Sequence, residues 1–219
     1  MKAFILAAGN SIRFGKDKLQ HYFSFGRLID LSIKNIKHIG LEPIVVTDNP
    51  YNFSNCDAEI IYKDPKLLGS YGSVISIRDY WEEGSLILDG DIIYHPEILL
   101  KISRYNSNVC ASSSLNIATG DELYIFKDLT SKIRSLSKNK VKSKLICNSQ
   151  FIGIVKFQSL NFDLLNRWHN PYKEELCWEE DILPLMDVED LEFNLPWFEV
   201  DFQSHIDHCE KVYEEIYKE

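Results

Sequence analysis

The chain has 219 residues, of which 45% are hydrophobic, and a formal net charge of -9. This length and apolar content suffice for one large α/β domain over residues 1–219. The negative charge argues against nucleic acid as a partner, because binding a phosphate backbone needs a dense cationic face. Five cysteines without a C-x-x-C pair indicate reduced thiols rather than a disulfide framework or a zinc site.

The sequence shows no run of about 18 apolar residues, and its apolar start is too short for a signal peptide. We therefore expect a cytoplasmic protein with no membrane partner. A homodimer is left open. The basic cluster at residues 132–144 lacks interleaved aromatics, so it predicts a solvated hairpin or loop rather than a nucleic-acid site.

Residues 4–18 form an apolar run that leads into small residues and then cations. The run is too short for a helix and predicts a buried strand that ends in an anion-binding loop. A dinucleotide-binding fingerprint fails, because Ser11 stands where its second Gly is needed. A P-loop is disfavoured, because the spacing after Gly9 is one residue too long and Asp17 replaces the metal-binding hydroxyl. An ordinary strand-to-helix turn with solvated cations is the alternative.

Short apolar runs then alternate with helical patterns, which favours a mostly parallel sheet wrapped by helices. Residues 28–39 have the apolar spacing of a helix, and Gly40 is placed to end it. Residues 43–47 and 58–62 predict strands. The small residues of the segment 67–73 predict a loop that opens another helix, whose apolar face extends to Trp81. Ser73 can serve there as an N-cap.

Residues 85–91 are an apolar strand that runs into Asp89, Gly90 and Asp91. Carboxylates at the carboxyl end of a central strand lie where open α/β sheets bind ligands. Such hard oxygen ligands suit Mg²⁺, which takes one or two carboxylates together with substrate phosphates. The alternative is an acidic turn that caps the helix starting near Pro96.

The second half of the chain is less regular. Residues 108–116, 122–127 and 151–157 predict strands. The acidic segment after Cys177 contains Trp178, and an aromatic ring beside a carboxylate can hold a cationic amine. A core Trp next to a solvated helix N-terminus explains the same residues equally well.

Near the C-terminus, residues 197–201 predict a strand with Glu199 and Asp201 on the same side, because side chains alternate with period two. Residues 204–207 have the pattern of a capping box. Apolar residues of the segment 206–216 then predict the buried face of a terminal helix.

Three of these patterns, A-A-G-x-x-x-R-x-G-x-x-K at residues 7–18, G-D at 90–91 and E-x-D at 199–201, resemble the nucleotidyltransferases that join a nucleoside monophosphate to a sugar phosphate or alcohol phosphate. The G-I-x-K at 153–156 and the aromatic–acid pair at 178–179 resemble the choline-phosphate and 2-aminoethylphosphonate cytidylyltransferase branch. Ser11 replaces a Gly of the family pattern, and a Ser with positive φ is strained. The resemblance implies a single-domain, Rossmann-like, three-layer αβα fold with a central mixed, mostly parallel sheet.

The resemblance also implies a CTP-dependent cytidylyltransferase that transfers CMP to a small amine-bearing phosphate or phosphonate, releases pyrophosphate and uses Mg²⁺. Phosphocholine, aminoethylphosphonate and phosphorylated glutamine all remain open as acceptors, and cytosine is not proved over uracil. Two alternatives stand beside it. One is a sugar-1-phosphate or other alcohol-phosphate nucleotidyltransferase that uses UTP or dTTP, and the other is a non-catalytic nucleotide-binding protein on the same fold.

By the same resemblance, Arg13 and Lys18 are the expected catalytic residues, and Asp91 and Asp201 are the expected metal ligands. The expected acceptor contacts are Trp178, Glu179 and Glu199. The expected nucleotide contacts are Leu6, Ala7, Ala8, Gly9, Asn10, Ser70, Gly72, Ser73 and Gly90.

Overall fold

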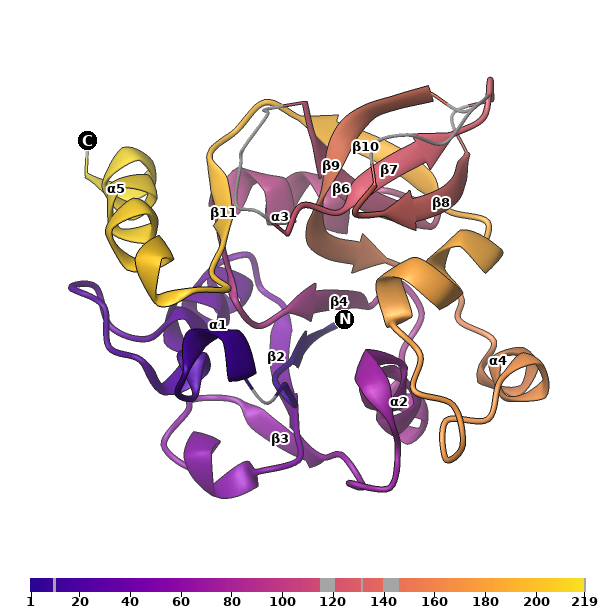
Figure 1. Ribbon diagram of the computed structural model, residues 1–219, viewed down its shortest axis with the longest axis horizontal. Coiled ribbons are helices and arrows are strands. Elements are labelled where there is room, and N and C mark those ends of the chain that lie inside the picture. Colours follow the sequence, from indigo (N-terminus) through magenta and orange to yellow (C-terminus); the bar gives the residue numbers. More distant parts are fainter. Residues whose placement is uncertain (10, 115–120, 131, 140–145, 219) are drawn as a thin grey trace.

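The computed structural model describes residues 1–9, 11–114, 121–130, 132–139 and 146–218. In this part of the chain the main sheet has the strand order β10-β6-β9-β4-β1-β2-β3, and β7 pairs with both β8 and β9 (Figure 1). Its strands are β1 (Lys2–Leu6), β2 (Glu42–Thr47), β3 (Glu59–Tyr62), β4 (Leu86–Asp89), β6 (Val109–Ser113), β7 (Tyr124–Lys127), β8 (Ile133–Ser137), β9 (Ile146–Lys156) and β10 (Glu189–Phe193).

Helices cover both faces of this sheet, which confirms the three-layer αβα architecture. One face carries α1 (Leu28–His38) and α3 (Pro96–Ser103), and the other carries α2 (Gly69–Ser76), α4 (Phe162–Trp168) and a helical segment, Trp178–Ile182. Alternation along the strands divides the core between the faces. In β1, for example, Ile5 packs toward α1 while Phe4 packs toward α2. We also find the five cysteines free, with Cys110 and Cys209 buried.

The sheet is mixed. The neighbours β4, β1, β2 and β3 run parallel, whereas β9 is antiparallel to both β4 and β6. Because parallel strands end at the same edge, the residues that follow Leu6, Thr47, Tyr62 and Asp89 meet there. Leu6 pairs directly with Asp89. The sequence-predicted anion-binding loop and the acidic turn are therefore neighbours.

A second, two-stranded sheet joins the C-terminal region to the end of β4. Its strands are β5 (Ile92–Tyr94) and β11 (Trp197–Glu199), which pair antiparallel. The terminal helix α5 (Ile206–Tyr217) packs on this sheet through Cys209 and Val212, as its apolar spacing predicted. This small sheet brings Glu199 and Asp201 to the binding edge of the main sheet, where Asp91 lies.

The segment 67–73 differs from the predicted loop, because α2 begins at Gly69 and its N-cap is Leu68 rather than Ser73. The Tyr71 N–H donates to the distant Leu176 carbonyl at 3.2 Å, so a tertiary contact supports the first turn. The helix also ends earlier than predicted, at Ser76. Trp81 lies beyond it and stacks on Phe4 at 5.7 Å between ring centroids.

Two further local predictions are wrong, and a third is met only in part. No capping box forms, because residues 203–205 make a 3-10 turn and the N-cap of α5, His205, gives no side-chain cap. The acidic turn does not cap α3, whose first turn is capped by the His95 ring at 3.2 Å from the Glu97 nitrogen. The described part of the basic cluster contains β8, which forms the predicted hairpin by pairing antiparallel with β7, but its Ile133 and Leu136 are buried rather than solvated. Residues 140–145 of that cluster, and 115–116 of the strand predicted at 108–116, lie outside the described residues.

None of the helices in the described ranges combines the length and the apolar character that crossing a membrane requires.

Candidate active site

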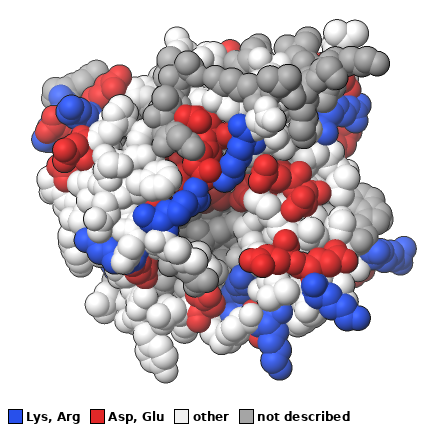
Figure 2. All heavy atoms as spheres, viewed as in Figure 1, with Lys and Arg blue, Asp and Glu red and all other residues white. Residues whose placement is uncertain are grey.

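A cleft of about 540 Å³ lies at the edge of the sheet where β1, β2, β3 and β4 end. Acidic and basic side chains gather around this hollow in the space-filling view (Figure 2). Ten residues singled out from the sequence line it: Leu6, Ala8, Gly9, Arg13, Ser70, Ser73, Gly90, Asp91, Glu179 and Glu199. The structure adds lining residues to which sequence reasoning gave no role at the site, among them Lys63, Asp121 and Lys138. Asp89 of the acidic turn and Gly153 of the G-I-x-K pattern line the cleft as well.

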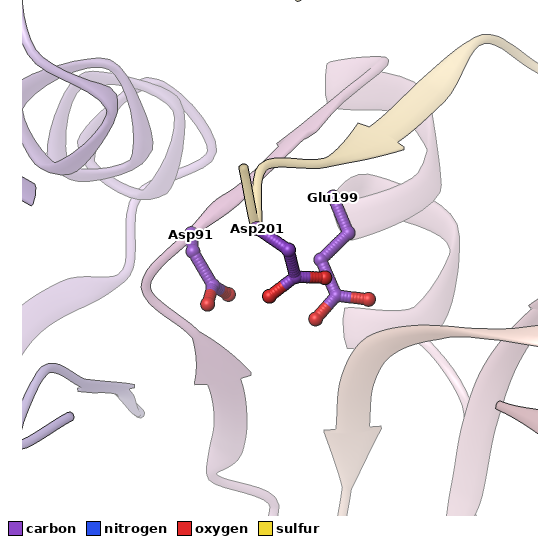
Figure 3. Close-up of side chains that lie close together, drawn as sticks. All are labelled: Asp91, Glu199 and Asp201. Atoms are coloured by element: carbon purple, nitrogen blue, oxygen red, sulfur yellow. The ribbon is translucent and has the colours of Figure 1, made fainter. Parts of the chain in front are cut away.

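Three carboxylates from two distant segments converge at one side of the cleft (Figure 3). One oxygen from each of Asp91, Glu199 and Asp201 lies within 4.8 Å of the others. The β5–β11 pairing produces this arrangement, since Glu199 pairs with Ile92 and the Val200 N–H donates to the Asp91 carbonyl at 3.0 Å. The sequence predicted two of these residues as metal ligands and Glu199 as an acceptor contact. The structure places Glu199 with the other two.

This carboxylate triad fits a divalent cation. Asp201 is 2% exposed, and its Oδ2 has no hydrogen-bond partner among the described residues. A buried carboxylate oxygen without a donor is unfavourable unless a cation or a ligand satisfies it. Carboxylate oxygens are also the ligands that hard cations such as Mg²⁺ prefer.

Lys18 lies against the triad. Its ammonium is 2.5 Å from Asp91 Oδ2 and 3.2 Å from Asp201 Oδ1. The backbone here is shaped by the Asp17 side chain, which accepts from the Leu19 N–H at 3.1 Å and caps a short 3-10 helix. Burial opposes the charge of Lys18, but the two carboxylates outweigh it and raise the lysine pKa. Lys18 is therefore a fixed cation at the edge of the cleft.

Arg13 approaches the same acids from the other side. Its guanidinium forms ion pairs with Asp121 and, at 3.4 Å, with Asp201, and it lies 5.7 Å from the Phe202 ring centroid. The side chain is 49% exposed, so a ligand can reach it. Lys138 also contacts Asp121, at 2.6 Å. No local pattern marked Asp121 or Lys138, because the fold alone brings the region of β7 and β8 over Arg13.

The loop after β1 has an unusual backbone at Ser11. Its φ is 47°, and it is the one non-glycine residue with positive φ in the described ranges. The Ser11 carbonyl accepts from the Phe14 and Gly15 N–H groups, and its Oγ accepts from the Lys18 N–H at 3.2 Å. Ser11 thus has the left-handed backbone conformation that a Gly would adopt easily, and local hydrogen bonds hold it in that conformation. Asn10 lies outside the described residues.

The opposite wall of the cleft is acidic. Asp89 shares the face of β4 that Ile87 occupies, and it lies near Glu179. Gly153 on the neighbouring β9 makes room for it, because a Cβ added there would lie 2.6 Å from Asp89 Oδ2. Burial raises the pKa of Asp89, and the charges of Glu179, Asp91 and Glu199 raise it further. Glu179 in turn accepts from Ser70 Oγ at 3.2 Å and from Cys177 Sγ at 2.8 Å.

Gly90 allows the acidic turn to approach β1. Its N–H donates to the Leu6 carbonyl at 3.0 Å, and an added Cβ would lie 2.7 Å from the same oxygen. This close contact explains why Gly stands between Asp89 and Asp91. The turn can thus present both carboxylates at the cleft.

Five of the described residues expected at the site are not part of the cleft lining. Two of them, Lys18 and Asp201, lie beside it at the triad, and the other three lie away from it. Ala7 is buried beneath the loop, and Gly72 is buried inside α2. Trp178 is 1% exposed and packs in the core, with its ring 5.7 Å from that of Phe157. The core interpretation of Trp178 therefore describes its position, and its ring is not available to a ligand in the cleft. Of the described aromatic side chains, Phe151 lines the cleft.

The family profile described as "MobA-like NTP transferase domain" matches residues 3–145, which is more than half of the chain. No curated protein sequence matches the chain significantly. Among solved structures, the inositol-1-phosphate CTP transferase from T. maritima is similar, with a TM-score of 0.79, 16% identity and coverage of 98% of this chain and 97% of that one.

Two other solved structures show the same similarity of fold. The CTP:phosphocholine cytidylyltransferase from Streptococcus pneumoniae has a TM-score of 0.72 and 16% identity, with 97% of this chain and 98% of that one covered. A UDP-glucose pyrophosphorylase complexed with UDP-glucose has a TM-score of 0.75 and 13% identity, with 98% of each chain covered. At these identities the structures establish the fold of the chain.

Proposed function

Because the chain belongs to the family of MobA-like NTP transferase domains and is a nucleotidyltransferase, we propose that it transfers CMP from CTP to a small phosphate or phosphonate that carries an amine. Pyrophosphate is the second product. Two of the similar structures are described as using CTP, one with inositol 1-phosphate and one with phosphocholine. Those descriptions support CTP as the donor.

The observation that carries the amine acceptor is the acidic wall formed by Asp89 and Glu179. Both carboxylates line the cleft beside the triad, and neither forms an ion pair with a described Lys or Arg. Partly buried carboxylates without a cation are unfavourable, and an ammonium group of a ligand removes that cost by pairing with them. The acceptor would thus place its amine at this wall and its phosphate toward Arg13.

The chemistry requires no general base. A phosphate monoester has a second pKa of about 6, so its oxygen is largely ionised at neutral pH. That oxygen attacks the α-phosphorus of CTP in line, one P–O bond forms, and the bond to the pyrophosphate oxygen breaks. The protein must bring two anions together and stabilise the charge that develops on the α-phosphoryl oxygens.

The proposed roles follow from position and charge. Arg13 and Lys18 would neutralise the triphosphate and the phosphoryl group in transfer, since both lie at the triad and both carry fixed charge. Asp91, Glu199 and Asp201 would hold Mg²⁺. Bound there, Mg²⁺ would neutralise phosphate charge and orient the triphosphate. The backbone of Ala8 and Gly9 would line the phosphate path.

A panel of substrates tests this function. Each of CTP, UTP, dTTP, ATP and GTP is combined with Mg²⁺ and with phosphoethanolamine, phosphocholine, aminoethylphosphonate, glycerol 3-phosphate or glucose 1-phosphate, and pyrophosphate is measured. We expect the highest kcat/KM with CTP and an amine-bearing acceptor. A preference for glucose 1-phosphate with UTP or dTTP would favour the sugar-phosphate alternative, and pyrophosphate release with no pair would overturn the assignment.

Two conservative variants test the acidic wall. Asp89→Asn and Glu179→Gln remove charge but keep shape, so we expect the KM for the amine acceptor to rise about 10-fold or more while the KM for CTP stays within about 3-fold. Glu83→Gln, at an exposed position away from the cleft, is the matched control and should change neither. If both wall variants raise the KM for CTP instead, the wall contacts the nucleotide and the proposed acceptor site is wrong.

A further inference from the structure

Lys63 is a buried lysine at the binding edge of the sheet. It follows β3 directly, is 7% exposed and nevertheless lines the cleft. Its backbone N–H donates to the Thr47 carbonyl at 2.8 Å, which fixes the segment to the end of β2. Its ammonium donates to the Gly69 carbonyl at 3.0 Å, at the start of α2. Both ends of the residue are therefore held in place.

The protein supplies few partners for this ammonium. A lysine has three N–H donors and no acceptor, and Gly69 accounts for one of them. No carboxylate among the described residues forms an ion pair with Lys63, although Asp48 and Glu175 lie near enough to attract it. Burial lowers the pKa of Lys63. The remaining donors are thus available to a ligand in the cleft.

The place of Lys63 in the cleft indicates which part of a ligand it meets. The triphosphate requires the triad with Arg13 and Lys18, and the acceptor amine requires the acidic wall. The part that remains lies at the ends of β1 to β3 and the start of α2. Its lining combines the apolar and small side chains of Leu6, Pro65, Leu67, Leu68 and Ser73 with the acids Asp48 and Glu175, which lie near Lys63. The apolar part of this lining suits the flat, uncharged surface of a nucleoside base.

A cation that only donates hydrogen bonds distinguishes the two pyrimidines. Cytosine presents two adjacent acceptors, O2 and the unprotonated N3, whereas uracil presents an N–H donor at position 3. An ammonium opposite this edge makes favourable hydrogen bonds with cytosine and opposes the N3–H of uracil. A mismatch of this kind leaves polar groups unpaired, and it discriminates more strongly than a difference in shape.

From this arrangement, and resting on the proposed function, we infer that Lys63 donates to the O2 and N3 edge of the nucleotide base and selects CTP over UTP. The Gly69 carbonyl positions the ammonium, and the apolar part of the cleft holds the ring. Selection is thus made by a side chain beyond β3 rather than by the cations that bind the triphosphate.

The test measures selectivity rather than rate alone. Dissociation constants of CMP and UMP are determined by calorimetry, and kcat/KM is determined for CTP and UTP with the best acceptor of the panel. We expect Lys63→Met to reduce the CMP-to-UMP preference at least 10-fold, mainly by weakening CMP. Lys63→Gln should bring the two nucleotides within about 3-fold of each other, since its amide can donate to one base and accept from the other. Lys66→Met, an exposed lysine of the same segment, is the matched control and should keep the wild-type preference.

The outcomes separate this inference from the proposed function. If the wild type binds CMP and UMP equally, or if Lys63→Met and Lys63→Gln both keep the wild-type preference, the inference is overturned. A purely structural role would lower the thermal unfolding temperature without changing the ratio of affinities. If no pair of the substrate panel releases pyrophosphate, the proposed function is rejected. Binding of CMP and UMP needs no acceptor, so the measured preference between them still tests the role of Lys63.

Discussion

The ammonium of Lys18 lies 2.5 Å from the carboxylate of Asp91, and it also contacts Asp201 at 3.2 Å. One cation of the first loop therefore bridges an acid of the turn after β4 and an acid of the C-terminal segment. The same two acids, together with Glu199, form the triad that fits a divalent cation. Positive charge, whether from lysine or metal, is what allows three carboxylates to lie together at this edge.

Removing the charge of Lys18 should strongly lower turnover. We expect Lys18→Met to lower kcat about 100-fold or more, because the phosphoryl group in transfer loses a fixed positive charge beside it in a partly buried site. Lys16→Met is the matched control, since Lys16 is exposed and does not line the cleft. The rate of pyrophosphate release gives kcat for both variants. A Lys18→Met protein with near-normal turnover would contradict the catalytic role of this residue.

Metal binding should depend on Asp201. We expect chelation by EDTA to abolish turnover and added Mg²⁺ to restore it. Binding of Mn²⁺, followed by electron paramagnetic resonance, should weaken about 10-fold or more in Asp201→Asn, because a carboxylate ligand is lost. Asp207→Asn, at an exposed position in the first turn of α5, should bind Mn²⁺ as the wild type does. Equal binding by the two variants would show that the cation lies elsewhere.

Gly153 should be required for stability for two reasons. Its φ is +86°, and a side chain at this position would lie against Asp89. Gly40 has a similar φ of 78° and no neighbouring atom within 4 Å, so Gly40→Ala isolates the backbone strain. We expect Gly40→Ala to cost about 1 kcal/mol and Gly153→Ala about 2–4 kcal/mol in the free energy of unfolding, measured with urea. In an Asp89→Gly background, which also removes the Cβ that would lie 3.2 Å from the added methyl group, the two costs should become similar. If the excess cost at Gly153 persists in that background, the contact with Asp89 is not its cause.

Ser11 offers a test of the strained loop. Ser11→Gly relieves the left-handed backbone but loses the hydrogen bond from the Lys18 N–H, so the free energy of unfolding should change by less than about 1 kcal/mol. Ser11→Ala keeps the strain and loses the bond, and it should be less stable than Ser11→Gly by about 1 kcal/mol. Urea titrations of the two variants make the comparison. The opposite order of stability would show that Ser11 is not strained in solution.

Much of the fold follows from local patterns. The helix at α1 and its end at Gly40 follow from apolar spacing and the Gly, and the first strands follow from short apolar runs bounded by turn residues. The position of Asp91 just after β4, and of Glu199 at the end of β11, follows from short apolar runs that lead into acids. The strand predicted over 197–201 ends at Glu199, so Asp201 lies just beyond it. These features depend on residues close together in the sequence, so the sequence by itself determined them.

The tertiary structure decided which of these residues meet. Pairing of β5 with β11 joins Asp91 to Asp201, and the contact with Leu176 starts α2 at Gly69 rather than opening a loop there. The same long-range packing buries Trp178 in the core and exposes Lys63 to the cleft. The spacing of apolar residues identifies the buried face of a single helix or strand. The partner that covers that face comes from a distant segment, so the carboxylate triad, the acidic wall and the proposed base contact became visible only in the folded chain.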